Sequence, residues 1–216
     1  MDKRNPGAIE YFHRRIDDFD SIYRDNHAGL RGFLDRTLRA SVKRRFKLAF
    51  DILGDMSGRS VLDIGCGTGR YMFEAVRRGA LGVIGLDAAA GAIVAARKLA
   101  QEQGMGKKVE FVQTDFMDFE ISNPYNIVFA VGYFDYIIEP ATHLEKMQKS
   151  CDQFFFASFP RLWHPMTPIR KIRLALNRCP VRFYTRNSVM KLLNDAGFKN
   201  YEIRIVARDF IVIARR

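Results

Sequence analysis

The stretch Val61-Leu62-Asp63-Ile64-Gly65-Cys66-Gly67-Thr68-Gly69-Arg70 decides the fold. A short apolar run leads into a glycine-rich turn and then into a helical pattern, which indicates a buried strand, a tight turn and a helix. Such a turn lets a ligand approach backbone N–H groups closely. The dinucleotide-binding fingerprint is excluded because its third glycine would fall at Arg70, and a P-loop is excluded because no Gly-Lys-Ser/Thr follows.

Short apolar runs continue to alternate with helical segments after this turn. Continuous apolar strands separated by helices predict a parallel sheet covered on both faces. The end of the chain differs, because Thr185 can cap a helix through Ala196, Gly197 ends it, and an antiparallel hairpin follows. Strands are predicted at Val61–Ile64, Val83–Leu86, Val109–Gln113, Ile127–Val131, Phe154–Ser158, Tyr201–Val206 and Phe210–Ala214, and helices at about 69–78, 89–103 and 140–150.

The N-terminal quarter of the chain reads as helical. An apolar stripe with helical spacing consists of Ile9, Phe12, Ile16, Phe19 and Tyr23, and a second pattern runs from Leu30 to Leu53 before Gly54. We therefore expect residues 1–56 to form a helical arm that helps to close a ligand site, and residues 57–216 to form the main domain.

Asp63 sits just before the glycine turn, where it would repel a pyrophosphate but could hold an ammonium group. With this acid, the chain resembles the class I S-adenosylmethionine-dependent methyltransferases, whose first motif reads much like Asp-Ile-Gly-Cys-Gly-Thr-Gly. The resemblance implies a Rossmann-like α/β fold with a seven-stranded, mostly parallel sheet of order 3-2-1-4-5-7-6. It also implies S-adenosylmethionine as cofactor and S-adenosylhomocysteine as product.

Further residues lie at the positions that this resemblance predicts for cofactor binding. Asp87 ends the second strand about 20 residues past the turn, where an acid can accept both ribose hydroxyls, although it could also cap a helix. By resemblance, Asp115 and Phe116 meet the adenine, and the backbone after the fourth strand passes under the methionine part. The expected cofactor-binding residues are Asp63, Gly65, Cys66, Gly67, Gly69, Asp87, Ala88, Asp115, Phe116, Val131 and Gly132, and no metal site is predicted.

Two departures from the family pattern limit the interpretation. Asn126 stands where the family usually has an acid, and we interpret it as a structural position. The Asn/Asp-Pro-Pro-Tyr signature of enzymes that methylate exocyclic amines or glutamine is absent, which disfavours those acceptors. Cys66 is interpreted as a small packing residue.

A hydroxyl or ammonium acceptor must also lose a proton, and four residues were considered for that role. His164 follows the fifth strand and Pro160 at the expected rim of the sheet, so His164 and Tyr133 are the predicted catalytic residues. His143 lies on a predicted helix and is interpreted as structural, and Asp135 is a further candidate. Many methyltransferases use no base, so this assignment stays open.

The chain has 216 residues and a formal net charge of +11, and residues 153–194 contain eight lysines and arginines but no acid. A helix between Pro168 and Pro180 would carry Ile169, Ile172 and Leu176 on one side, with Arg170, Lys171, Arg173 and Arg178 largely opposite. Such a helix fits a lid over the acceptor pocket, contact with an anionic membrane, or contact with nucleic acid. The basic acceptor-side insertion is placed at about 159–184, and membrane contact at residues 161–186.

The predicted activity is methyl transfer from S-adenosylmethionine to an O or N atom, with C less favoured, of a small, partly apolar acceptor. The alternatives are an RNA methyltransferase that uses the basic face, or a silent methyltransferase-like binding protein. The longest run without a charged residue, Ile121–Phe134, is too short to span a bilayer. We expect a cytoplasmic protein that can lie peripherally at the inner membrane surface, and its oligomeric state is left open.

Overall fold

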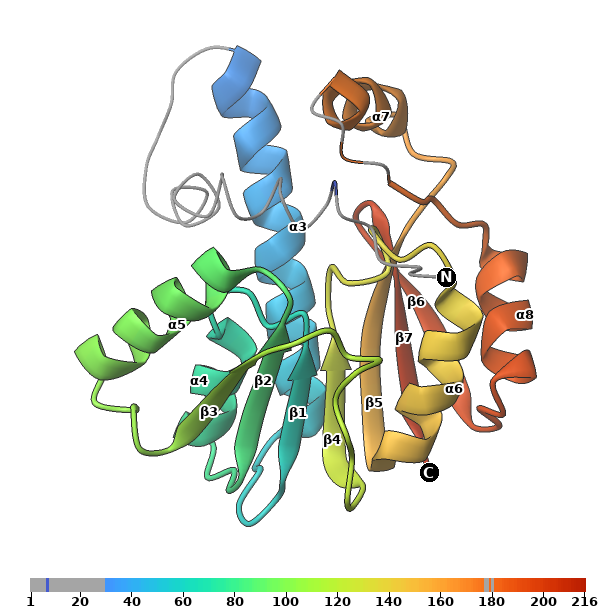
Figure 1. Ribbon diagram of the computed structural model, residues 1–216. Coiled ribbons are helices and arrows are strands. Elements are labelled where there is room, and N and C mark those ends of the chain that lie inside the picture. Colours follow the sequence, from blue (N-terminus) through green and yellow to red (C-terminus); the bar gives the residue numbers. More distant parts are fainter. Residues whose placement is uncertain (1–6, 8–29, 177–178, 180) are drawn as a thin grey trace.

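The computed structural model describes residues 7, 30–176, 179 and 181–216 of the chain. An open seven-stranded sheet of order β3-β2-β1-β4-β5-β7-β6 forms its centre (Figure 1), as the sequence predicted. Neighbouring strands run parallel, except that β7 is antiparallel to both β5 and β6. The strands are β1 Val61–Ile64, β2 Val83–Asp87, β3 Val109–Gln113, β4 Tyr125–Ala130, β5 Cys151–Pro160, β6 Tyr201–Val206 and β7 Asp209–Arg215.

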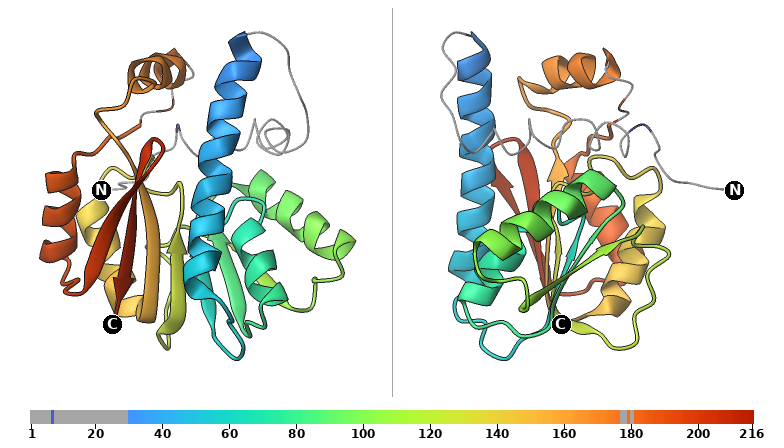
Figure 2. Two further views of the ribbon diagram at one scale, coloured as in Figure 1. Left: turned by 180° about the vertical axis from the view of Figure 1, so that it is seen from behind. Right: turned by 60° about the vertical axis from the view of Figure 1, so that its left-hand side comes forward.

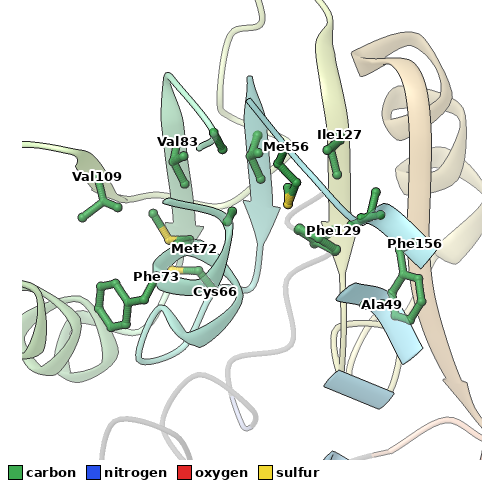
Figure 3. Packing of buried hydrophobic residues seen from close by; sticks show 14 of the residues in the cluster. Ala49, Met56, Cys66, Met72, Phe73, Val83, Val109, Ile127, Phe129 and Phe156 are labelled. Carbon is green, nitrogen blue, oxygen red and sulfur yellow. The ribbon is translucent and has the colours of Figure 1, made fainter. Parts of the chain in front are cut away.

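Helices cover both faces of this sheet (Figure 2). Buried residues of α3, α4 and α5, such as Phe50, Met72 and Ile93, pack in one apolar cluster with one face of the sheet. Figure 3 shows part of this cluster, with Ala49 and Met72 labelled. Leu144 of α6 and Val189 of α8 belong to a second cluster on the opposite face. The helices are α3 Leu30–Leu53, α4 Arg70–Arg77, α5 Ala90–Glu102, α6 Pro140–Ser150, α7 Thr167–Leu176 and α8 Arg186–Asp195.

Local sequence signals explain where several of these elements begin and end. Thr185 caps α8 in a capping box, because its side chain accepts from the Ser188 N–H while the Ser188 hydroxyl accepts from the Thr185 N–H. Gly197 then takes a φ of 87°, which ends the helix as predicted. Asn126 has the expected structural role, since its side-chain oxygen accepts from the Ser60 N–H at 2.9 Å.

The fifth strand is longer than predicted. The sequence pattern limited it to Phe154–Ser158, whereas β5 covers Cys151–Pro160. Its pairing with β7 continues as far as the Pro160–Asp209 pair, and this partner is more than 40 residues away in the sequence. A local apolar pattern does not predict such pairing, because the additional residues of β5 are held in the strand by their neighbours in the sheet and not by a periodicity of their own.

The end of α3 belongs to the core. Ala49 and Phe50 are almost fully buried, together with Met56 in the connection to β1. The last turns of this helix are therefore packed under the sheet. The stripe from Ile9 to Tyr23 that was expected to close the site lies outside the described residues, and the division at residue 56 stays a prediction.

Candidate cofactor and acceptor site

The glycine turn joins β1 to α4 at the carboxyl end of the sheet. Gly65, Gly67 and Gly69 have φ values of 71°, 55° and 82°, a region that side chains with a Cβ rarely adopt. A Cβ at Gly65 would also lie 2.9 Å from the Tyr133 ring, whereas one at Gly67 would meet no atom within 4 Å. The turn therefore leaves open space beside Gly67, next to the ends of β1 and β2.

Asp87 fixes this turn from the end of β2. Its carboxylate accepts hydrogen bonds from the Gly67 N–H and the Ala89 N–H, each at 2.9 Å. Burial raises the pKa of Asp87, and these two hydrogen bonds act in the opposite direction. The side chain thus serves both the turn and the start of α5, while carboxylate oxygens keep capacity for further donors, as ribose hydroxyls would be. Ala88 lies between the two contacts and is half-buried.

Asp63 is a buried carboxylate beside the turn. It is 3% exposed, and no cationic side chain among the described residues forms an ion pair with it. Burial, with a smaller contribution from repulsion by Asp87, raises its pKa to about 8. A buried acid without a cation is costly, so a ligand with an ammonium group would relieve it. The donor set therefore fits the expected cofactor.

The turn after β3 carries Asp115 and Phe116. Phe116 is buried, and Asp115 accepts from the Met117 N–H at 2.8 Å. Lys146 of α6 donates to the carbonyl oxygens of Phe116 and Phe119, both at 2.7 Å, and lies over the Phe116 ring. Sequence reasoning missed Lys146, because nothing in its local pattern shows that α6 supports this turn.

The loop after β4 brings together Gly132 and a tyrosine–histidine pair. Gly132 has a φ of 77° and donates its N–H to Ser158 Oγ at 2.8 Å, and Val131 before it is half-buried. The Tyr133 hydroxyl lies 2.8 Å from His143 Nδ1. Burial, followed by the charges of Asp115 and Asp87, raises the pKa of Tyr133 well above its ordinary value.

His143 therefore faces the site from α6. Burial lowers the pKa of His143 from its ordinary value and so favours the neutral imidazole, which can accept the tyrosine proton. Its position on a predicted helix had favoured a structural role for this histidine, with His164 as the predicted catalytic residue. The pairing across 10 residues joins a loop to a helix, which periodicity alone does not show.

His164 lies in a different part of the site, beyond the end of β5. It lines a pocket with Arg161, Arg170 and Arg208, and its Nδ1 accepts from the Met166 N–H at 3.2 Å. No contact joins it to Tyr133 within the part of the chain that the structure describes. The two predicted catalytic residues are therefore not brought together.

The basic face that was predicted for α7 is wrong at Arg170. Its guanidinium pairs with the buried Asp135, and its side chain is only 10% exposed. The apolar residues of the same helix point the other way, since Ile169, Ile172 and Leu176 are all more than half exposed. The helix thus presents apolar residues to solvent and turns one of its predicted surface cations inward, because Asp135 offers a buried partner.

Cys66 packs as the sequence predicted. The thiol is buried, and a Cβ added at Gly85 would lie 2.9 Å from its sulfur, in the cluster that also holds Met72 (Figure 3). Burial raises the pKa of Cys66 well above its usual value, so the thiol stays protonated. The described residues contain no group of three or more histidine, cysteine or acidic side chains that could hold a metal ion.

The strand order, the glycine turn and the two acids at the ends of β1 and β2 define the class. The fold is that of the class I S-adenosylmethionine-dependent methyltransferases. Residues 55–154 match the family described as methyltransferase domain. Within the described residues, none of the helices has the length and apolar character needed to cross a membrane.

Solved structures share the fold over nearly the whole chain. Magnesium protoporphyrin IX methyltransferase from Synechocystis PCC 6803, with bound S-adenosylmethionine, has a TM-score of 0.77 and 19% identity, covering 100% of this chain and 98% of that one. The 1,6-didemethyltoxoflavin-N1-methyltransferase of Burkholderia thailandensis has a TM-score of 0.71 and 17% identity, covering 98% and 88%. Likeness at these identities shows the common fold.

Curated relatives match over shorter stretches. Cycloartenol-C-24-methyltransferase of Arabidopsis thaliana is 33% identical over 96 residues, which is 44% of this chain and 29% of that protein. The ribosomal protein L11 methyltransferase of Vibrio parahaemolyticus is 39% identical over 56 residues, 26% of this chain and 19% of that protein. The matched part thus covers less than a third of the length of these relatives.

Proposed function

We propose that the protein is an S-adenosylmethionine-dependent methyltransferase that acts on a small, partly apolar molecule at an O or N atom. The observation that carries the proposal is a pair of acids beside an open glycine turn, the buried Asp63 and the half-buried Asp87. The names of the structural neighbours support a small acceptor, since they include a porphyrin and a toxoflavin methyltransferase.

Different residues at the carboxyl edge of the sheet would bind different parts of the cofactor. Asp63 would hold the ammonium group, Asp87 the ribose hydroxyls, and Asp115 with Phe116 the adenine, while the backbone at Gly65 to Gly69 and at Val131 and Gly132 follows the remainder. When bound, the cofactor supplies a methyl group on a sulfonium that is already activated for displacement. The chain therefore contributes mainly alignment and exclusion of water.

The Tyr133–His143 pair is suited to receive the acceptor's proton. The neutral His143 can hold the hydroxyl proton of Tyr133, which leaves an oxygen lone pair of Tyr133 free to accept from the acceptor. Tyr133 is thus the group that would touch the acceptor, and His143 orients it. His164 lies apart from this pair and lines the pocket beyond the end of β5.

Calorimetry with S-adenosylhomocysteine tests cofactor binding. We expect binding to the wild type and no comparable binding of NAD. Asp87→Ala should weaken binding at least tenfold, because hydrogen bonds to a charged group contribute about 1.5–3 kcal/mol each. The matched control is Asp195→Ala, which removes an exposed acid paired with Lys191 and should change nothing. Tighter binding of NAD would overturn the proposal.

Two other functions remain as outcomes of activity measurements. A nucleic-acid methyltransferase would need free cations, yet Arg182 and Arg186 of the basic segment donate to the carbonyl oxygens of Ile138 and Ile203, and Arg170 is buried. Transfer of labelled methyl from the cofactor to an extract of small metabolites, and not to RNA, supports the proposed acceptor class. No transfer at all would indicate the silent binding protein.

The exposed apolar side of α7 supports peripheral contact with an anionic membrane. Ile172 and Leu176 are 62% and 80% exposed, and Trp163 nearby is 78% exposed. Trp163 is the sole tryptophan of the chain, so its emission reports on this surface directly. We expect a blue shift with phosphatidylglycerol vesicles at low salt, and its loss at high salt.

The double variant Ile172→Gln/Leu176→Gln should weaken vesicle binding at least tenfold, because burying each apolar side chain is worth about 1.5–3 kcal/mol. Ile205→Gln, on the exposed side of β6, is the control and should bind as the wild type does. An unchanged emission spectrum at low salt would exclude this contact.

A further inference from the structure

A pocket lies on the acceptor side of the sheet. It is lined by Arg161, His164, Arg170 and Arg208, with apolar surface from Met166 and Phe183. The carboxyl ends of β4 and β5 are parallel neighbours, and β7 begins beside the end of β5. The pocket therefore opens at the same sheet edge as the loop that carries Tyr133.

The two acids near this pocket are already engaged. Asp209, which is 1% exposed, accepts from Ser41 Oγ at 3.3 Å and from Arg45 Nη1 at 3.1 Å. Asp135, which is 4% exposed, pairs with Arg170. Each buried carboxylate thus has an arginine of its own, and further arginines at this edge are left in excess.

Arg208 is the cation in excess. Its Nε is buried without a hydrogen-bond partner, and its guanidinium forms no ion pair with any residue that the structure describes. Its pKa falls to about 10, because burial and repulsion by Arg170 and Arg45 outweigh the attraction of Asp209 and Asp135. Arg208 as a whole is half-buried, and a charge partly withdrawn from water without a partner is destabilising unless a ligand compensates it.

His164 and Arg161 add donors to the same wall. His164 Nδ1 accepts from the Met166 N–H, so in the neutral ring Nε2 carries the proton and can only donate. Burial and the positive charges of Arg161 and Arg208 lower the pKa of His164. Arg161 uses Nη1 on the Ala207 carbonyl at 2.9 Å and keeps its other N–H groups. The lining therefore contains donors and no carboxylate. Asp209 and Asp135, the two acids that attract Arg208, lie outside this lining and are paired with other arginines.

We propose that Arg208, Arg161 and His164 form a subsite for an anionic group of the methyl acceptor, a carboxylate or a phosphate. The subsite anchors one end of the acceptor and leaves the remainder to extend toward Gly132 and Tyr133. Guanidinium groups suit this task, because their planar N–H groups bind carboxylate and phosphate oxygens in pairs. The assignment to an acceptor rests on the proposed function, whereas the anion site itself does not.

Binding of small aromatic anions to the full chain tests the subsite. Benzoate, phenyl phosphate and the neutral benzamide are titrated by calorimetry, with and without S-adenosylhomocysteine. We expect at least one anion to bind tenfold or more tightly than benzamide, and Arg208→Gln to remove most of that preference. The matched control, Arg204→Gln, removes an exposed arginine of the same hairpin and should keep it. Preference for benzoate identifies a carboxylate subsite, and preference for phenyl phosphate a phosphate subsite.

The thermal stability of Arg208→Gln separates a binding role from a structural one. Without ligand, this variant should melt at or above the wild-type temperature, because it loses a half-buried cation whose Nε has no hydrogen-bond partner. A marked fall in melting temperature with unchanged anion affinity would overturn the proposal, as would equal binding of benzoate, phenyl phosphate and benzamide. Anion binding in a protein that fails to bind S-adenosylhomocysteine would overturn the assignment to a methyl acceptor but not the anion site.

Discussion

The Asp63→Asn variant should be more stable than the wild type without ligand and yet bind the cofactor poorly. The folded-state pKa of Asp63 is raised to about 8, so between pH 4 and 8 the folded protein binds a proton that the unfolded chain releases. The free energy of unfolding therefore falls as pH rises through this window. Asparagine carries no charge and escapes that cost.

At pH 8 we expect the melting temperature of Asp63→Asn to exceed that of the wild type by at least about 2–4 °C, equivalent to about 1 kcal/mol or more for a chain of this size. The difference should shrink toward pH 4 and vanish below it, where the carboxyl of the unfolded chain is protonated as well. Cofactor affinity should fall at least tenfold, because the carboxylate that would hold the ammonium group is gone.

Asp51→Asn is the control for this prediction. Asp51 is an exposed acid paired with Lys47 on α3, so its replacement should leave both the pH dependence and the affinity unchanged. Scanning calorimetry across pH gives the stability, and titration with S-adenosylhomocysteine gives the affinity. If Asp63→Asn melts below the wild type at pH 8, the carboxylate is stabilising and its burial has been compensated within the chain.

The parts of the fold that sequence reasoning predicted are those fixed by neighbours along the chain. The boundaries of β1 and β3 followed from short apolar runs, and the start and end of α8 from Thr185 and Gly197. The glycine turn could also be predicted, because a turn that binds a ligand through its backbone needs positive φ angles at fixed positions within one short segment.

The acceptor side could not be predicted in the same way, because its interactions join residues far apart in the sequence. Arg170 and Asp135 are separated by 35 residues, and Arg45 and Asp209 by 164. A helical pattern assigns every cation on the polar side to solvent. It therefore predicted Arg170 at the surface. In the structure, the Arg170 side chain points inward instead, because it pairs with the buried Asp135. The excess positive charge at Arg208 can be recognised only from the structure, which shows that Asp209 pairs with Arg45 and Asp135 with Arg170.

Replacing Tyr133 by phenylalanine should leave cofactor affinity intact and slow methyl transfer. The Tyr133 ring lies against Gly65 and packs edge-on to Phe134, with centroids 5.5 Å apart, and phenylalanine keeps these contacts. What is lost is the hydroxyl that pairs with His143. A general base contributes about 10²–10⁴-fold, so kcat should fall by that factor while KM for the cofactor is preserved.

The pH dependence distinguishes proton transfer from packing. Burial lowers the pKa of His143 from its ordinary value, because it disfavours the charged form of the imidazole. Wild-type kcat should decline as pH falls through that pKa, since the protonated imidazole can no longer take the tyrosine proton. This acid limb should be absent from Tyr133→Phe, because the path to His143 is broken, and His143→Gln should lose it as well.

Tyr201→Phe is the matched control, since Tyr201 donates its hydroxyl to Asn194 at 2.7 Å, between α8 and β6, away from the Gly132 loop. It should retain both kcat and the acid limb. Single-turnover transfer of labelled methyl to the acceptor fraction recovered from extracts provides the rate. A Tyr133→Phe enzyme with wild-type kcat and an unchanged pH profile would mean that alignment alone drives the reaction. If the acid limb of the pH profile is lost in His164→Gln and kept in Tyr133→Phe, the base is His164, in the pocket beyond β5.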